Sequence, residues 1–392
     1  MRRFQGLCGL LLLGLAGCGG FFVPQNNSGG GGTNTGDYIY VSNQSNTFLA
    51  GFGVNSSGAL SVLNGSPYNN GIAAQSLAVT PANTFLYAGT TNGIYAYAIN
   101  SNGSITVQNS GSAVAQDLVA TQMQVDSRGN YLLASGFGTA IGAQAIGIYT
   151  INTSTGLLTA VGGSPLALYT GNGSTPAVVT PTGLLITPNN SYVYVSLGAL
   201  GVQILTLGAN GALSTGGSPP PLLLPVSTST SPSDVGLASD PLSAFLFVSE
   251  TNTGLRVLSI GTGGTLKEVS GSPYAVGTGP TGVIVDPTGS YVYVANKGSN
   301  NISGFTLTAA SGQLTAIAGS PFASGGQFPT ALVNDNSKKF VAVINSGNNG
   351  SGGNSDMQVF KFDTTTNGKL DPVSTATTGT DPTNPLSIAA SH

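Results

Sequence analysis

Seven short runs of apolar residues, each led by an aromatic side chain, recur along this chain of 392 residues. A period of 46 to 61 residues separates their first residues, which are Tyr38, Phe85, Tyr131, Tyr192, Phe245, Tyr291 and Phe340. Short strands of β-branched and aromatic residues that return at such a period, with Gly, Pro and Asn between them, are typical of β-propellers. The sequence therefore predicts an all-β, seven-bladed β-propeller in which each repeat forms one blade.

The sixth repeat shows the expected blade most clearly. Pro280–Val285 predicts a first strand, and Asp286-Pro287-Thr288-Gly289 predicts a tight turn, because Pro presets φ and Gly accepts a positive φ. Three further strands are predicted at Tyr291–Ala295, Ile302–Leu307 and Gln313–Ala318. Each blade should therefore be a sheet of four short antiparallel strands.

Two further markers recur in step with the aromatic runs. Pro-Thr-Gly begins the first strand at Pro181 and Pro280, and Gly-Ser-Pro closes the blade. The closures start at Gly65, Gly163, Gly217, Gly271 and Gly319. Markers in register from residue 37 to the end indicate one propeller domain over 37–392.

The two ends of the repeat array predict how the ring closes. The first repeat begins directly at its second strand, Tyr38, whereas Pro385–Ala390 matches only the beginning of a first strand. The last strand of the chain should therefore complete the first blade. Such pairing removes the open sheet edges that the ring would otherwise expose.

The N-terminus has the layout of an export signal. Arg2 and Arg3 precede an apolar run that is shorter than the ~20 residues of a membrane-spanning helix. Leu15-Ala16-Gly17-Cys18 resembles a bacterial lipobox. This resemblance implies a signal peptide over 1–17, lipidation of Cys18, and a Gly-rich tether over 18–36. It predicts an exported protein held by its lipid at a bacterial membrane, with the outer membrane or cell surface favoured.

The composition limits the partners and cofactors. Only 6% of the residues are charged and the net charge is −3, so no surface for nucleic acid is expected. The sequence offers no Cys/His set for zinc, no phosphate-binding loop and no calcium loop. We therefore predict no metal and no cofactor, and we expect a monomer.

Extra residues gather in loops that a propeller places on one face. They lie at Phe137–Gly147, Leu166–Val179 and Pro219–Pro232, between second and third strands or between blades. We call this side the insertion face. Insertions on one face of a repeat protein often mark the surface that binds a ligand or partner.

Several motifs resemble one propeller family. Tyr293-Val294-Ala295-Asn296 and Tyr40-Val41-Ser42-Asn43 are close to its Tyr-Val-Thr-Asn signature. With the Gly-Ser-Pro and Pro-Thr-Gly markers, the chain after the leader resembles the seven-bladed lactonase-type propellers, which include 6-phosphogluconolactonase and carboxymuconate-cyclising enzymes. The resemblance implies His, Arg and Glu in a central cleft for enzymes of the cyclising kind. Here the single histidine is the terminal His392, and Arg128 and Arg256 fall in a first turn and a third strand.

Candidate site residues come from the insertion face. Glu250 is equivalent in the repeat to Asn43, Asn296 and Asn345, while Lys297 follows one step later and Asp234 lies near the mouth of the channel. Glu250 and Lys297 could bind or polarise a sugar-like ligand. The alternative is a solvated ion pair worth at most ~1 kcal/mol, with the Asn side chains bonding nearby backbone in turns.

Two functions remain open at this point. The scarcity of ionisable groups and the predicted lipid favour an anchored binding or scaffold module, whose insertion face meets a glycan, a peptide or an envelope protein. The family resemblance, with Glu250 and Lys297, supports instead a lactonase-like hydrolase that acts on a sugar lactone.

Overall fold

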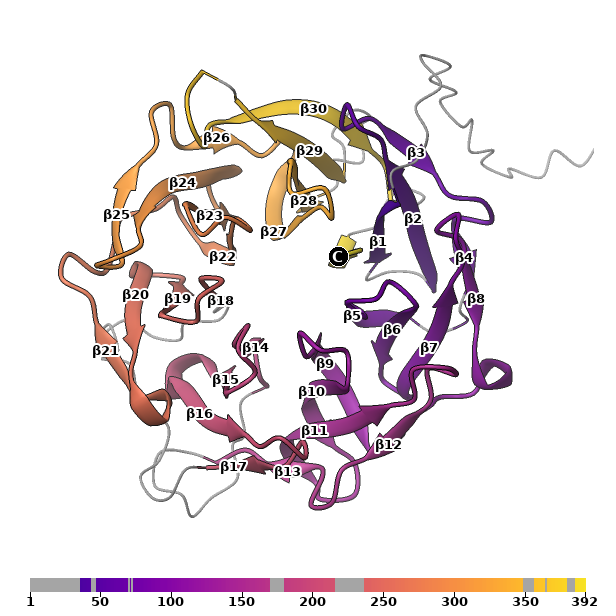
Figure 1. Cartoon of the computed structure of the whole chain (residues 1–392). Coiled ribbons are helices and arrows are strands. Elements are labelled where there is room, and N and C mark those ends of the chain that lie inside the picture. Colours follow the sequence, from indigo (N-terminus) through magenta and orange to yellow (C-terminus); the bar gives the residue numbers. More distant parts are fainter. Residues whose placement is uncertain are drawn as a thin grey trace, which may run out of the picture. The chain divides into compact units, whose positions relative to one another are not determined.

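The computed structural model describes residues 36–43, 47–69, 71, 73–169, 180–215, 236–347, 356–363, 365–378 and 385–392. All of them belong to the unit of the chain that follows residue 31. Within these residues, seven antiparallel sheets surround a central axis (Figure 1). The predicted seven-bladed β-propeller is therefore confirmed.

Each blade contains four strands in order from the axis outward. The innermost strands are β31 (Pro385–Ala390), β5 (Ala74–Val79), β9 (Leu118–Val125), β14 (Gly183–Ile186), β18 (Leu237–Ser239), β22 (Pro280–Val285) and β27 (Gln327–Asn334). The second strands are β1 (Asp37–Asn43), β6 (Phe85–Thr90), β10 (Tyr131–Gly138), β15 (Tyr192–Ser196), β19 (Phe245–Glu250), β23 (Tyr291–Asn296) and β28 (Phe340–Gly347). The third strands are β2 (Phe48–Val54), β7 (Gly93–Ile99), β11 (Ala143–Ile151), β16 (Val202–Leu207), β20 (Gly254–Ile260), β24 (Asn301–Thr308) and β29 (Met357–Phe362). The outermost strands are β3 (Leu60–Val62), β8 (Ile105–Val107), β12 (Leu158–Ala160), β17 (Leu213–Ser214), β21 (Leu266–Glu268), β25 (Gln313–Ala316) and β30 (Leu370–Ala376).

The Gly-Ser-Pro closures turn the chain back onto the third strand. In the sixth blade the Ser320 hydroxyl accepts the backbone N–H of Gly304 at 2.9 Å, and Ser66, Ser164 and Ser272 do the same in their blades. Three closures continue into a two-residue strand that pairs with the third strand: β4 (Tyr68–Asn69), β13 (Leu166–Ala167) and β26 (Phe322–Ala323). The Gly-Ser-Pro motif therefore forms a tight turn that leads the chain back along the third strand, and does not merely end the blade.

The aromatic residue that opens each second strand packs against the next blade. The Tyr291 ring covers Gly368, whose φ is +79°, and a Cβ on this glycine would lie 2.4 Å from the ring. The Tyr293 hydroxyl also donates to the Gly368 carbonyl at 2.6 Å. The same contact recurs at every junction, namely Tyr38 with Gly103, Phe85 with Gly156, Tyr131 with Gly211, Tyr192 with Gly264, Phe245 with Gly312 and Phe340 with Gly58.

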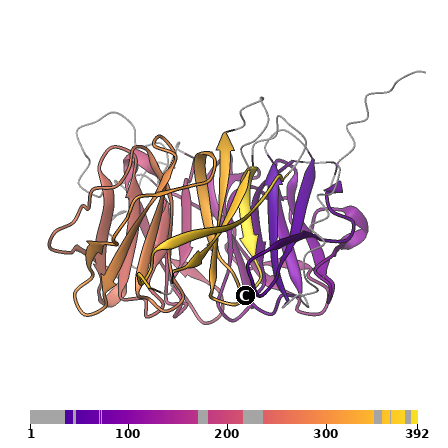
Figure 2. The same ribbon diagram turned by 90° about the horizontal axis from the view of Figure 1, so that it is seen from above.

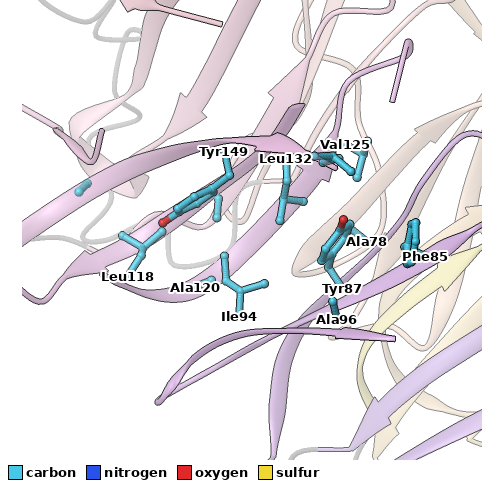
Figure 3. Close-up of a cluster of buried hydrophobic side chains, with 13 residues drawn as sticks. Ala78, Phe85, Tyr87, Ile94, Ala96, Leu118, Ala120, Val125, Leu132 and Tyr149 are labelled. Atoms are coloured by element: carbon cyan, nitrogen blue, oxygen red, sulfur yellow. The ribbon is translucent and has the colours of Figure 1, made fainter. Parts of the chain in front are cut away.

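The core lies between adjacent blades. Between the second and third blades, Tyr87, Ile94 and Leu118 pack against Leu132 and Tyr149 (Figure 3). Each of these five side chains is at most 1% exposed. Burial of such faces is the main stabilising contribution to the ring, because apolar area removed from water stabilises by ~25 cal/mol per Å².

The last strand completes the first blade, as predicted. Strand β31 is antiparallel to β1, with Tyr40 opposite Ala389. The Ser391 hydroxyl accepts the N–H of Tyr38 at 2.8 Å and donates to the Gly36 carbonyl. In the edge-on view of Figure 2 the chain ends at the lower face of the ring, where His392 bonds to Asn83 in the first turn of the next blade.

An acidic residue orders the turn between first and second strands. Asp286 is 2% exposed, and its Oδ1 accepts the backbone N–H groups of Ser290 and Tyr291 at 2.7 Å each. Asp126, Asp240 and Asp335 make the same pair of bonds in their blades. The Thr80 hydroxyl accepts both N–H groups in its blade, whereas the Thr187 hydroxyl accepts only that of Tyr192.

Replacement of this carboxylate should measurably weaken the fold. We expect Asp286→Ala to lower the free energy of unfolding by about 2–3 kcal/mol, because two partly buried N–H groups lose a charged acceptor. Asp286→Thr should lose less than half as much, since Thr80 makes both bonds at the equivalent position before a proline. Urea unfolding of the two variants measures the difference, and equal losses would contradict the assigned role.

Candidate functional site

A cavity of about 430 Å³ lies at the centre of the ring. Residues of the innermost segment of every blade line it, and Lys297 joins the wall from the loop after β23. The volume falls in the range of ~300–1,000 Å³ that is usual for small-molecule sites. Because all seven repeats contribute, the site exists only when the ring is closed.

Bulges in the innermost strands shape the upper part of the cavity. In five blades the pairing of first and second strands skips one or two residues near the insertion face. The skipped residues are Leu386, Gln75, Thr121, Thr281 with Gly282, and Thr330, and all of them line the cavity. A β-bulge interrupts the regular alternation of side chains between the two faces of a sheet. The bulges therefore bring four polar residues, Gln75, Thr121, Thr281 and Thr330, to the wall of the channel.

A ring of apolar side chains lies deeper, further along the same strands. Each blade contributes one residue to it: Leu77, Met123, Leu184, Leu237, Val283, Leu332 and Ile388. The wall thus combines this apolar ring with a similar share of polar residues, so it is more polar than the usual site for a small organic molecule.

Three polar groups of the wall lack partners within the described part of the chain. The amides of Gln75 and Gln122 have no hydrogen bond there, and the Thr330 hydroxyl is buried without one. Buried polar groups normally find a partner. These three groups are therefore available to hydrogen-bond a ligand.

Among the described residues that line the cavity, Lys297 is the one that carries a charge. It follows β23 directly, and its backbone N–H donates to the Gly279 carbonyl at 2.8 Å, which fixes the start of its loop. The described residues give its ammonium group no ion pair. The structure thus places this sequence candidate at the cavity.

Glu250 points instead into its own sheet. Its carboxylate accepts two hydrogen bonds from the Arg256 guanidinium, at 2.8 and 3.0 Å, and Glu268 accepts a third at 2.6 Å. Arg256 is 4% exposed and Glu250 is 8% exposed. Burial lowers the pKa of Arg256, but the hydrogen bonds and charges of Glu250 and Glu268 more than offset this and raise it overall. Glu250 does not line the cavity, and the structure does not bring it together with Lys297 there.

The equivalent asparagines are fully buried behind the wall. Asn43 and Thr378 exchange hydrogen bonds at 2.8 and 3.0 Å. Asn296 donates to Asn301 and Ser303, and Asn345 donates to Ser324. They tie the second strands to the neighbouring strand β24 and to the loops at Ser324 and Thr378. Asp234 and Cys18 lie outside the described residues, as do the Pro219–Pro232 insertion and most of Leu166–Val179.

The histidine lies away from the cavity. His392 is on the opposite face of the ring, and burial lowers the pKa of its imidazole. In the described ranges, no three His, Cys, Asp or Glu side chains gather in a way that could hold a metal ion. No helix among those ranges is long and apolar enough to cross a membrane.

The Pro-Thr-Gly motif marks the cavity wall as well as the start of a strand. It places Thr182 and Thr281 in the wall, and the related Pro329-Thr330-Ala331 places Thr330 there. A polar residue between proline and a small residue, at the start of a strand that otherwise carries apolar residues, is the sequence signal for the wall position in these three blades.

Comparison with known proteins agrees with this architecture. Residues 55–386 match the family described as "Lactonase, 7-bladed beta-propeller". No curated protein matches the sequence.

Solved structures share the fold at low sequence identity. A Bacteroides fragilis protein provisionally named a 6-phosphogluconolactonase is 15% identical and has a TM-score of 0.65, and the similarity covers 92% of this chain and 99% of that one. The periplasmic gluconolactonase of Pseudomonas aeruginosa is 14% identical with a TM-score of 0.63, over 91% of this chain and 99% of that one. At these identities the likeness extends to the fold alone.

Proposed function

Because this chain belongs to the lactonase family of seven-bladed β-propellers, we propose that it hydrolyses a sugar lactone in the central cavity, with Lys297 as the residue that polarises the lactone carbonyl. The observation that carries the proposal is a lone cation among unpaired neutral hydrogen-bonding groups in a cavity of small-molecule size.

Hydrolysis of a lactone requires few functional groups from the protein. The oxygen of a water molecule attacks the carbonyl carbon, the ring C–O bond breaks, and a proton from water reaches the ring oxygen to give a hydroxy acid. Negative charge develops on the carbonyl oxygen in the transition state, and a positive group placed there lowers the barrier. Lys297 would supply that charge, while Gln75, Gln122 and Thr330 would hold the substrate and the attacking water.

The position of Glu250 bears on this mechanism. Both of its oxygens are held by Arg256, so it is not a free general base at the cavity. The proposal therefore places the catalytic contribution in binding, orientation and electrostatic stabilisation. Delivery to the cell envelope by lipidation of Cys18 belongs to the same proposal and rests on the sequence of the leader.

Loss of the cavity lysine should abolish most of the activity. We expect the protein to hydrolyse glucono-δ-lactone faster than the spontaneous reaction, and Lys297→Met to lower kcat about 100-fold, as removal of one stabilising group does in other enzymes. Continuous titration of the released acid measures both rates.

Lys267→Met is the matched control, because Lys267 lies on the outermost strand β21. It should keep the activity of the unaltered protein. Full activity in Lys297→Met, or no acceleration by the unaltered protein, would refute the proposal. Binding of the lactone without turnover would favour the binding module instead.

A further inference from the structure

The number and position of the basic residues limit the charge that the cavity can accept. Of ten Lys and Arg residues, Arg2 and Arg3 precede the propeller and the other eight are all described. Lys297 is the one of these eight that lines the cavity.

The other seven are placed elsewhere. Arg128, Lys338 and Lys339 lie in first turns, on the face opposite the insertions, and Arg256 is buried between two glutamates. Lys267, Lys361 and Lys369 lie on or beside outer strands. The segments between the described ranges after residue 36 add only acidic charges, Asp234 and Asp381. No second cation of the propeller can therefore reach a ligand in the cavity.

A phosphate group does not suit such a site. A phosphate monoester carries about −1.5 to −2 charges at pH 7. Proteins hold it with several charged or backbone donors, and an uncompensated charge in an enclosed site is costly. A 6-phosphorylated sugar acid would bring this group in addition to its carboxylate. The single positive charge of Lys297 cannot balance the phosphate and the carboxylate together.

An unphosphorylated sugar suits the wall well. A neutral lactone needs no counter-charge, and its hydroxyls can donate to and accept from the free amides of Gln75 and Gln122 and the Thr330 hydroxyl. After ring opening, the product carries one carboxylate, which a single ammonium group matches.

We infer that the cavity selects ligands with at most one negative charge, so that the substrate is an unphosphorylated sugar lactone and the product, a sugar monocarboxylate, binds at Lys297. For the substrate, this inference rests on the proposed function. For the binding of the acid, it rests only on the residues of the cavity wall.

Two measurements test it separately. Calorimetry should show gluconate binding at least about tenfold more tightly than 6-phosphogluconate, with loss of gluconate binding in Lys297→Met. Hydrolysis should show kcat/KM for glucono-δ-lactone above that for 6-phosphogluconolactone by a similar factor. Thr330→Lys adds a second cation to the wall. It should reduce the difference in affinity between the two acids and the difference in kcat/KM between the two lactones, whereas Lys267→Met should change neither difference.

The outcomes distinguish the two ideas. Tighter binding of 6-phosphogluconate, or faster hydrolysis of its lactone, would overturn the inference while leaving lactone hydrolysis in place. Selective binding of gluconate without any turnover would support the inference for the acid and end the proposed function. Equal binding of both acids would also overturn it.

Discussion

Deletion of Leu386–His392 should lower the melting temperature of the protein by about 10 °C or more. Strand β31 is the innermost strand of the first blade, and its loss removes a full ladder of hydrogen bonds to β1. Each such bond contributes ~1 kcal/mol net, and Ala389 and Ala390 also fill two core clusters. In a domain of this size each kcal/mol shifts the midpoint by roughly 1–2 °C.

Two point variants on β31 compare the contributions of a buried and an exposed side chain to the melting temperature. Ala389→Asp places a charge in the core and should be strongly destabilising. Leu386→Ser changes a residue that is 38% exposed and should leave the melting temperature almost unchanged. A truncated protein that melts within a degree or two of the full chain would show that the ring does not depend on its last strand.

Arg256→Met should lower the free energy of unfolding by about 3–5 kcal/mol. Removal of one partner of a buried ion pair leaves the other charge uncompensated, and here Glu250 and Glu268 would also repel each other. Replacement of both members, in Arg256→Met/Glu250→Met, should recover much of the loss because no orphan charge remains at the buried end. Urea unfolding curves of the single and double variants give both values.

A partly exposed group of three charges provides the control. Lys369 bridges Asp363 and Asp371 at 3.2 and 2.8 Å on the outside of the last blade, and Lys369→Met should change stability little. If Arg256→Met is equally harmless, the buried triad is not a structural element. Glu250 would then be open again to a role at the cavity.

The fold could be predicted in detail because its signals are local and repeated. The first strand of the sixth blade, Pro280–Val285, has the bounds that its residues predicted. The predicted pairing of the chain's end with the first blade is also confirmed, because an incomplete repeat at each end leaves one way to close the ring.

The site could be predicted only in part because its geometry depends on register. Lys297 became a candidate through its repeat position alone. Glu250 had an equivalent position, but its partner Arg256 comes from the next strand, where Val248 faces Arg256. Repeat position does not show which way a side chain turns. The bulged residues of the wall could not be predicted from the sequence for the same reason, since a bulge breaks the alternation of side chains on which strand patterns rely.

Strand β1 has neighbours on both sides, β2 and the terminal β31, and all seven of its residues are buried. Tension applied through residue 36 would load this strand along its own axis, against two hydrogen-bonded ladders at once. Shearing two ladders together demands far more force than unzipping a lone edge strand. A polypeptide tether attached at this point would therefore pull on a strand that is held from both sides.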